Sequence, residues 1–226
     1  EGLVRDALRK PIDALPLAEL AKGKKHVVII SSDHTRPVPS HITMPILLEE
    51  IRKNNPEVRI TILIATGMHR PTTHEELVNK YGEEIVKNEE IVIHDAYNDN
   101  EMTFKGILPS GGELWINKLV DEADLLMSEG FIEPHFFAGF SGGRKSVLPG
   151  IASKKTVLWN HNAKFIANKN ARAGNLENNP IHQDMLYAAK QAKIQFILNV
   201  VINGEKRIIK AFAGDLESAH AEGCKL

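Results

Sequence analysis

The segment His26-Val27-Val28-Ile29-Ile30-Ser31-Ser32-Asp33-His34-Thr35-Arg36-Pro37 changes character at its middle. Its first part, His26–Ile30, is a β-branched apolar run, the pattern of a strand buried on both faces as in a parallel sheet. Its second part is polar and reaches a proline, which stops a strand. The segment therefore predicts a buried parallel strand that ends in a polar loop at the edge of a sheet.

The same pattern recurs along the chain, with helix-type segments between the strand-type segments. Strands are predicted at His26–Ile30, Arg59–Ala65, Ile91–His94, Glu113–Ile116, Leu125–Ser128, Gln195–Val201 and Arg207–Ala213. Helices are predicted at residues 45–54, 83–87, 117–122, 154–167 and 181–193, and from Thr73 and Asp215 onward. This alternation predicts an α/β fold with a mainly parallel, Rossmann-like sheet sandwiched by helices. The last two strands, joined by Asn203-Gly204, predict an antiparallel pair near the C-terminus.

Three sequence signals indicate where helices begin. Pro45 is placed in the first turn of its helix, where the missing N–H costs nothing. Thr73 and Glu76 have the spacing of a capping box. Asp215 is a favourable N-cap residue for a last short helix.

Charge and composition exclude several classes of protein. Lys+Arg 28 against Asp+Glu 29 gives a net charge of −1, which offers no general attraction to nucleic acid or to an anionic membrane. No apolar run is long enough to cross a bilayer, and the first residues lack a signal-peptide pattern. The single cysteine, Cys224, cannot form an internal disulfide. We therefore expect a cytoplasmic protein with no nucleic-acid or membrane partner, and a local site for a small molecule.

A glycine-rich stretch, Gly130–Ser153, contains His135 and the adjacent pair Arg144-Lys145. Glycines let backbone N–H groups face an anion, and the basic pair adds positive charge, so the stretch predicts a loop that binds a phosphate-bearing ligand. The stretch is not the phosphate-binding loop of nucleoside triphosphatases. Counted from Gly139, that motif requires a second glycine where Arg144 stands.

Polar residues follow three of the predicted strands. Asp33 and Arg36 follow the first, His69 the second, and His135 the strand Leu125–Ser128. Since the carboxyl ends of parallel strands share one sheet edge, these residues are expected to converge. Two histidines suit proton transfer on either side of a substrate, and arginine suits a carboxylate. Asp33 can orient a histidine or fix Arg36.

His161 is a candidate metal ligand on different grounds. It lies in Trp159-Asn160-His161-Asn162, and no second ligand stands beside it at the spacing of a zinc site. The residues alone therefore predict an anion-binding α/β enzyme with acid/base histidines, and they leave the role of His161 open.

Three long motifs, in order, resemble the N-terminal domain of the nickel-dependent lactate racemase family. They are SSDHTRPVPS at residues 31–40, ATGMHRPTTHEE at 65–76 and HFFAGFSGGRKSVLPG at 135–150. The likeness covers nearly the whole chain. It is less specific for the substrate than for the family, because related members racemise or epimerise several 2-hydroxy acids.

The resemblance implies a cofactor and roles for individual residues. The cofactor is a nickel-pincer nucleotide, pyridinium-3,5-bisthiocarboxylic acid mononucleotide, covalently attached at Lys145 through a thioamide, with His161 as the protein ligand of nickel. His69 and His135 are implied as the catalytic acid/base pair and Arg36 as a substrate-binding residue. The other implied cofactor-binding residues are Asp33, His34, Thr35, Arg36, Gly142, Gly143 and Arg144. Of these, charge and glycine content place Arg144 and the two glycines around the phosphate.

The implied reaction is racemisation or epimerisation of a 2-hydroxy acid, with lactate as the first choice. One histidine removes the hydroxyl proton while hydride moves from the α-carbon to the pyridinium ring; return of hydride to the other face, with a proton from the second histidine, inverts the centre. Family members continue into a second domain and depend on cofactor-synthesis proteins. We expect residues 1–226 to be the N-terminal cofactor-binding and catalytic domain, with the C-terminal domain absent from this chain and little activity without it.

Two alternatives from other classes are a phosphate-handling transferase and a non-enzymatic carrier. The transferase would use Arg144 and Lys145, turn over nucleoside triphosphates and carry no nucleotide on the lysine. The carrier would hold nickel or the cofactor, and its parent protein would racemise no hydroxy acid.

Overall fold

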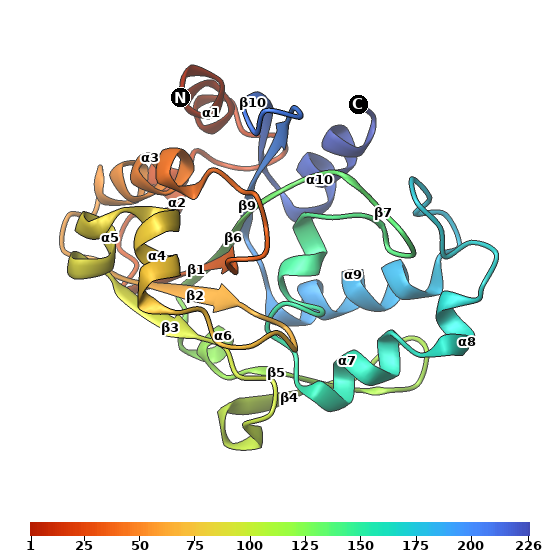
Figure 1. The fold of residues 1–226 in the computed structure, drawn as a ribbon. Coiled ribbons are helices and arrows are strands. Elements are labelled where there is room, and N and C mark those ends of the chain that lie inside the picture. Colours follow the sequence, from red (N-terminus) through yellow and green to blue (C-terminus); the bar gives the residue numbers. More distant parts are fainter.

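The computed structural model describes residues 1–226, and a six-stranded sheet forms its centre (Figure 1). The strands are β1 (His26–Ser32), β2 (Arg59–Ala65), β3 (Glu90–Ile93), β6 (Leu125–Phe131), β9 (Phe196–Ile202) and β10 (Ile208–Gly214). They lie in the order β10-β9-β6-β1-β2-β3, and only β10 is antiparallel to its neighbour. The predicted fold class, including the antiparallel pair near the C-terminus, is confirmed.

The direction of chain progression reverses between β1 and β6. From β1 the chain adds β2 and β3 on one side, and then returns to add β6 and β9 on the other side. In doubly wound sheets, ligands bind outside the carboxyl ends of the strands at this switch point. The topology thus marks the space beyond Ser32 and Phe131 as the place for a site.

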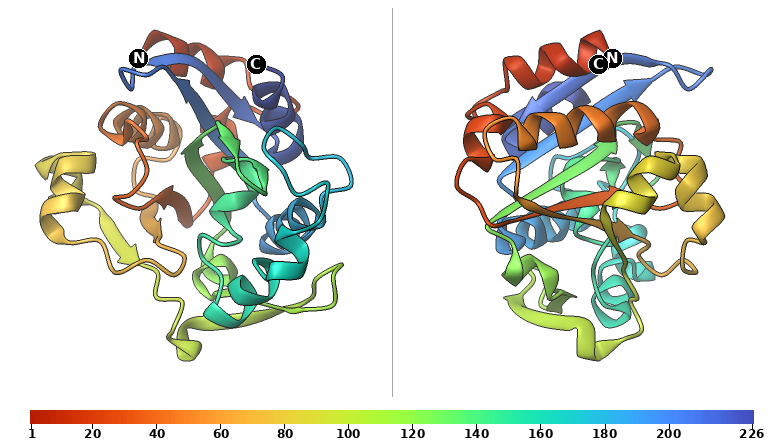
Figure 2. Two further views of the ribbon diagram at one scale, coloured as in Figure 1. Left: turned by 45° about the vertical axis from the view of Figure 1, so that its right-hand side comes forward. Right: turned by 90° about the vertical axis from the view of Figure 1, so that its left-hand side faces the viewer.

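Helices cover both faces of the sheet (Figure 2). On one face pack α1 (Gly2–Arg9), α2 (Leu17–Ala21), α3 (Ser40–Arg52), α4 (His74–Tyr81) and α5 (Glu83–Asn88). On the other pack α6 (Leu119–Glu122), α7 (Lys154–Asn160), α8 (Ala163–Ile166), α9 (Pro180–Ala192) and α10 (Leu216–Cys224). Ile29 and Ile30 point to opposite faces and are both 0% exposed. This burial on both sides explains why β1 reads as an unbroken apolar run. None of these helices has the length and apolar character needed to cross a bilayer.

Two short hairpins and two 3₁₀ turns complete the fold. They are β4 (Met102–Ile107) with β5 (Glu113–Asn117), β7 (Pro134–His135) with β8 (Gly139–Phe140), η1 (Asp99–Glu101) and η2 (Gly143–Ser146). The predicted strand Glu113–Ile116 exists, but it pairs with β4 outside the central sheet. The sequence pattern missed β4 because Phe104 and Ile107 are half-exposed, so the strand lacks a buried apolar run.

Two predicted helix boundaries are wrong. The helix expected to start near Pro45 begins at Ser40, so Pro45 lies inside α3 rather than in its first turn. The helix predicted for residues 154–167 is interrupted at His161, because Asn162 accepts the N–H of Phe165 and starts α8.

Other local predictions are confirmed. Thr73 and Glu76 form the capping box of α4, and Asp215 caps α10. The connection between β9 and β10 is longer than a two-residue turn, since it runs from Asn203 to Arg207. The Asn203 side chain closes it by accepting the N–H groups of Glu205 and Arg207.

Candidate active site

A cavity of about 320 Å³ opens at the carboxyl ends of the central strands, at the switch point of the sheet. This volume lies within the range of about 300–1,000 Å³ typical of small-molecule sites. Eight of the residues singled out from the sequence line it: Asp33, Arg36, His69, His135, Gly142, Gly143, Lys145 and His161. The predicted convergence of residues from separate strand ends is therefore observed.

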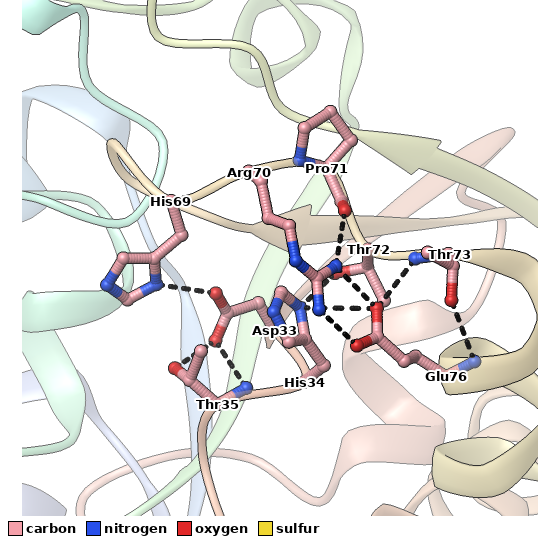
Figure 3. A network of polar contacts seen from close by, with 9 residues as sticks. All are labelled: Asp33, His34, Thr35, His69, Arg70, Pro71, Thr72, Thr73 and Glu76. Atoms are coloured by element: carbon pink, nitrogen blue, oxygen red, sulfur yellow. Dashed lines mark hydrogen bonds and ion pairs between the residues drawn. The ribbon is translucent and has the colours of Figure 1, made fainter.

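Asp33 holds His69 in one orientation (Figure 3). The Oδ2 atom of Asp33 lies 2.7 Å from Nδ1 of His69, while Oδ1 accepts the hydroxyl and the N–H of Thr35 at 2.7 and 3.1 Å. Asp33 is 1% exposed, so its carboxylate has a fixed position. With Nδ1–H donated to the carboxylate, His69 presents an Nε2 lone pair. Of the two roles that the sequence left open for Asp33, the geometry supports the orientation of a histidine.

His135 carries its ring proton on the other nitrogen from His69. Its Nδ1 accepts the N–H of Ala138 at 3.3 Å, so the neutral ring carries its proton on Nε2, which lies 3.4 Å from Nζ of Lys145. Burial lowers the pKa of His135 to about 3, and the cations of Lys145 and Arg36 contribute further. The ring is therefore neutral near pH 7.

Lys145 lies on the η2 turn, with Nζ directed toward His135 and the face of the Phe137 ring. Burial lowers the pKa of this amine to about 7, with smaller contributions from the cations of Arg144 and Arg36. A large fraction of the amine is thus unprotonated near neutral pH, which is the form that acts as a nucleophile.

His161 ends α7, and its buried Nδ1 atom has no hydrogen-bond partner of good geometry, although the backbone of Val157 lies close enough to raise the pKa of the ring. Burial lowers its pKa to about 4, with the cation of Lys145 as the second cause, so the ring is neutral and can bind a metal. The ring of Phe137 lies edge-on between His161 and His135, at centroid distances of 5.0 and 4.7 Å. No group of three or more His, Cys, Asp or Glu side chains is arranged for a metal ion.

Arg144 requires a correction. It is 1% exposed and is not among the residues that line the cavity. Its guanidinium donates to the carbonyl oxygens of Ala138 and Phe140 at 2.7 and 2.8 Å and to Nδ1 of His182 at 3.0 Å, and it lies 3.1 Å from Nε2 of His220. The side chain therefore organises the loop from behind, and it does not surround a phosphate in the cavity as the sequence had suggested.

His34 and Thr35 also lie outside the cavity lining. Nδ1 of His34 lies 3.0 Å from the hydroxyl of Thr72, and the Thr35 hydroxyl donates to Asp33 (Figure 3). Neither side chain lines this cavity, and the expectation that both contact a cofactor stays a prediction. Their observed role is to fix the loop that carries Asp33 and Arg36.

Gly142 and Gly143 line the cavity, but the protein itself requires them to be glycine. Gly142 has φ 76°, and a Cβ there would lie 2.7 Å from Oδ1 of Asn199. Gly143 has φ 51°, and a Cβ there would lie 2.8 Å from the His220 ring. Its N–H is donated to Asn199 at 2.8 Å. Left-handed backbone and close packing account for both glycines, and their contact with a cofactor stays a prediction.

Three polar residues of the cavity wall were missed by the sequence reading: Ser128, Glu129 and Asn199. Glu129 is 2% exposed and accepts the hydroxyls of Ser31, Ser40 and Thr43. Ser128 and Glu129 lie within β6, and Asn199 lies in the middle of β9. They were missed because the strand-end rule selects residues that follow a strand, whereas these three belong to the strands themselves.

The buried histidines predict that acid destabilises the fold. His94 and His220 are 1% and 4% exposed, and burial lowers their pKa from 6.5 to about 4 and about 3. Between those values and 6.5 the unfolded chain binds protons that the folded chain does not bind, so their stabilising contribution is complete above pH 6.5 and decreases below it. For each pH unit below 6.5, each of these histidines should lower the free energy of unfolding by about 1.4 kcal/mol.

Urea denaturation of the chain at pH 7, 6 and 5 tests this expectation, and the midpoint should fall at each step. The variant His220→Gln cannot titrate at this position, so its stability should vary less steeply with pH. A midpoint that is constant from pH 7 to pH 5 would contradict the assigned neutral state of these rings.

Comparison with known proteins decides the family. A family profile described as the lactate racemase N-terminal domain matches residues 1–174. The chain belongs to the lactate racemase family. This membership confirms the resemblance drawn from the three sequence motifs.

The family relatives are similar over nearly all of this chain. A lactate racemase from Lactiplantibacillus plantarum is 63% identical over 221 residues, which are 98% of this chain and 52% of the relative. A lactate racemase from Thermoanaerobacterium thermosaccharolyticum is 60% identical over 225 residues, 100% of this chain and 53% of the relative. The chain thus spans about half the length of the curated relatives that it matches.

Solved structures share the fold. The lactate racemase apoprotein from Thermoanaerobacterium thermosaccharolyticum superposes with a TM-score of 0.98 at 60% identity, over 99% of this chain and 54% of that one. A crystal structure of a Thermotoga maritima protein superposes with a TM-score of 0.81 at 25% identity, over 98% of this chain and 57% of that one.

Proposed function

We propose that residues 1–226 form the N-terminal domain of a 2-hydroxy acid racemase, with lactate as its substrate. The observation that carries the proposal is the pair His69 and His135, which come from separate strand ends and line one cavity. The two neutral rings carry their protons on different nitrogens, Nδ1 in His69 and Nε2 in His135. The names of the relatives at 60–63% identity support the choice of lactate. Because the chain spans about half of those relatives, the activity is assigned to the complete protein.

Arg36 is suited to bind the substrate carboxylate. It lines the cavity and is exposed, and its guanidinium makes no ion pair or side-chain hydrogen bond within the chain. A guanidinium can hold a carboxylate through two parallel hydrogen bonds, which orients the substrate as well as binding it. The α-carbon and its hydroxyl would then lie between the two histidines.

Proton transfer is the task of the histidines. In one direction Nε2 of His69 takes the hydroxyl proton, and the carboxylate of Asp33 stabilises the resulting imidazolium. His135 returns a proton on the other side of the reacting centre. In the reverse direction it takes the hydroxyl proton, which requires the tautomer with the ring proton on Nδ1 and loss of the Ala138 N–H contact. To return a proton, His135 must first gain a second proton, which the Lys145 ammonium opposes. An amide-type linkage at Lys145 carries no charge and would remove this opposition.

The cavity residues fit the nickel-pincer nucleotide that the family resemblance implies. Lys145 offers a near-neutral amine for covalent attachment, and His161 offers a neutral ring without competing hydrogen bonds for nickel. When bound, this group supplies the acceptor and donor of the α-carbon hydride. The chain would supply the attachment, the orientation of the substrate and the proton relay.

The transferase alternative loses its main support in the geometry. It assigned phosphate binding to Arg144 and Lys145 together, but the Arg144 guanidinium is buried among protein acceptors. The carrier alternative makes the same use of Lys145 and His161 as the racemase, so it must be separated by experiment.

The test uses the complete protein, expressed with cofactor-synthesis proteins. Intact mass should show a nucleotide adduct that is absent from Lys145→Ala, and metal analysis should show nickel that is lost in His161→Ala while the adduct remains. Chiral analysis should show both enantiomers formed from either lactate. A loaded protein that racemises no hydroxy acid would support the carrier, and an unmodified, metal-free protein would refute the cofactor assignment.

A further inference from the structure

Ser128 is a buried hydroxyl without a hydrogen-bond partner. Its side chain is 1% exposed, its Oγ atom has no partner, and the residue lines the cavity. Buried hydroxyls are nearly always hydrogen-bonded, because an unpaired one loses its bonds to water without replacement. The position therefore requires an explanation that the protein atoms alone do not give.

The surrounding strands cannot supply a partner for this hydroxyl. In β6, Ser128 lies between Ile30 of β1 and Ile197 of β9, its register neighbours in the sheet, and both side chains are apolar. Gly130, two residues further along β6, is on the same face and has no side chain to cover it. The cavity, which Ser128 lines, is therefore the side from which a partner for this hydroxyl can come.

The neighbouring polar groups of the cavity floor are already engaged within the protein. Asn199 accepts the N–H of Gly143 at 2.8 Å and donates to the carbonyl of Leu198 at 2.9 Å. The Ser146 hydroxyl donates to the carbonyl of Gly143 at 2.8 Å. The Arg144 guanidinium points away from the cavity, so no arginine of this loop is left for a ligand. Among these groups only the Ser128 hydroxyl is uncommitted.

We propose that the Ser128 hydroxyl is a subsite for an oxygen atom of the bound mononucleotide, on its phosphoryl or ribose group. The proposal rests on the proposed function, because it takes the nucleotide as the ligand of this cavity. It assigns recognition of that oxygen to a neutral hydroxyl at the floor of the cavity, in place of the arginine contact expected from the sequence.

Ser128→Ala separates a ligand contact from a structural one. Without ligand, the variant of the complete apoprotein should melt at the wild-type temperature or above it, because the substitution removes an unpaired buried polar group. Its affinity for nicotinic acid mononucleotide, a pyridinium mononucleotide without sulfur or nickel, should fall about tenfold in calorimetric titration, as expected for one lost hydrogen bond.

Ser31→Ala is the matched control. The Ser31 hydroxyl lies on the other face of the sheet, where it donates to Glu129 at 2.6 Å and accepts from Tyr81 at 2.7 Å. This variant should lower the melting temperature of the apoprotein and leave the affinity for the mononucleotide unchanged.

The proposal is overturned if Ser128→Ala lowers the melting temperature of the apoprotein, if it leaves the affinity unchanged, or if the wild-type apoprotein does not bind the mononucleotide. Lactate racemisation by the loaded wild-type protein is measured separately. If the loaded wild-type protein racemises lactate but Ser128→Ala keeps the wild-type affinity for the mononucleotide, only the subsite proposal is rejected. If Ser128→Ala loses affinity for the mononucleotide tenfold but the loaded wild-type protein does not racemise lactate, only the proposed reaction is rejected.

Discussion

Replacement of Asp33 by asparagine in the complete, cofactor-loaded protein is expected to lower kcat for lactate racemisation by about 10²–10⁴-fold. The carboxylate accepts Nδ1–H of His69 at 2.7 Å and so leaves the Nε2 lone pair free. An asparagine of the same size can turn its NH₂ group toward Nδ1. That contact selects the tautomer with the proton on Nε2, which cannot accept the substrate hydroxyl proton.

The kinetics should show the loss in kcat with little change in KM, because Arg36 rather than Asp33 is assigned to the substrate carboxylate. Intact mass on the same sample shows whether the nucleotide adduct is still present. Asp6→Asn, which removes an exposed carboxylate on α1, is the control and should keep the wild-type kcat. A fully loaded Asp33→Asn protein with wild-type kcat would show that the orientation of His69 is not needed for the reaction.

Much of the fold and part of the site could be predicted from the sequence because buried parallel strands leave a strong local pattern. Strands such as β1 are covered on both faces, so their residues are continuously apolar and their ends are marked by the first polar residues. The carboxyl ends meet at one edge, and for this reason the convergence of Asp33, His69 and His135 could be predicted. The edge hairpin β4–β5 lacks this double burial, and its first strand was missed for that reason.

The errors in the site concern directions of side chains, which residue type and spacing do not specify. Arg144 and Lys145 are adjacent and both basic, yet one is enclosed by carbonyl groups and the other faces the cavity. The neighbours of the Arg144 guanidinium include His182, which accepts its Nε–H, and His220, whose Nε2 lies 3.1 Å away, and both are distant in sequence. In the same way, the unpaired state of Ser128 depends on neighbours from two other strands. Only the assembled fold reveals these partners.

Arg144→Leu is expected to lower the free energy of unfolding by about 3 kcal/mol, which is the net result of two opposing effects. The three shortest contacts of the guanidinium, with Ala138, Phe140 and His182, are charge-assisted hydrogen bonds. At about 2 kcal/mol each they contribute roughly 6 kcal/mol, and their loss leaves buried acceptors unpaired. Burial of the cation opposes this, because it lowers the pKa of Arg144 from 12.5 to about 10. That shift corresponds to an unfavourable free energy of about 3 kcal/mol for burial of the cation, and this cost is absent in the leucine variant.

Urea denaturation of wild type, Arg144→Leu and Arg144→Lys measures the balance. The lysine variant keeps a cation but cannot reach acceptors on several sides at once, so it should be destabilised as well. Arg172→Leu, at an exposed position, should lie within about 0.5 kcal/mol of wild type. If Arg144→Leu kept wild-type stability and lost only nucleotide binding, the guanidinium would have to reach the ligand, and the structural role assigned to it would be wrong. A loss of stability in the absence of any nucleotide would instead show that Arg144 supports the loop from which Lys145 and His135 face the cavity.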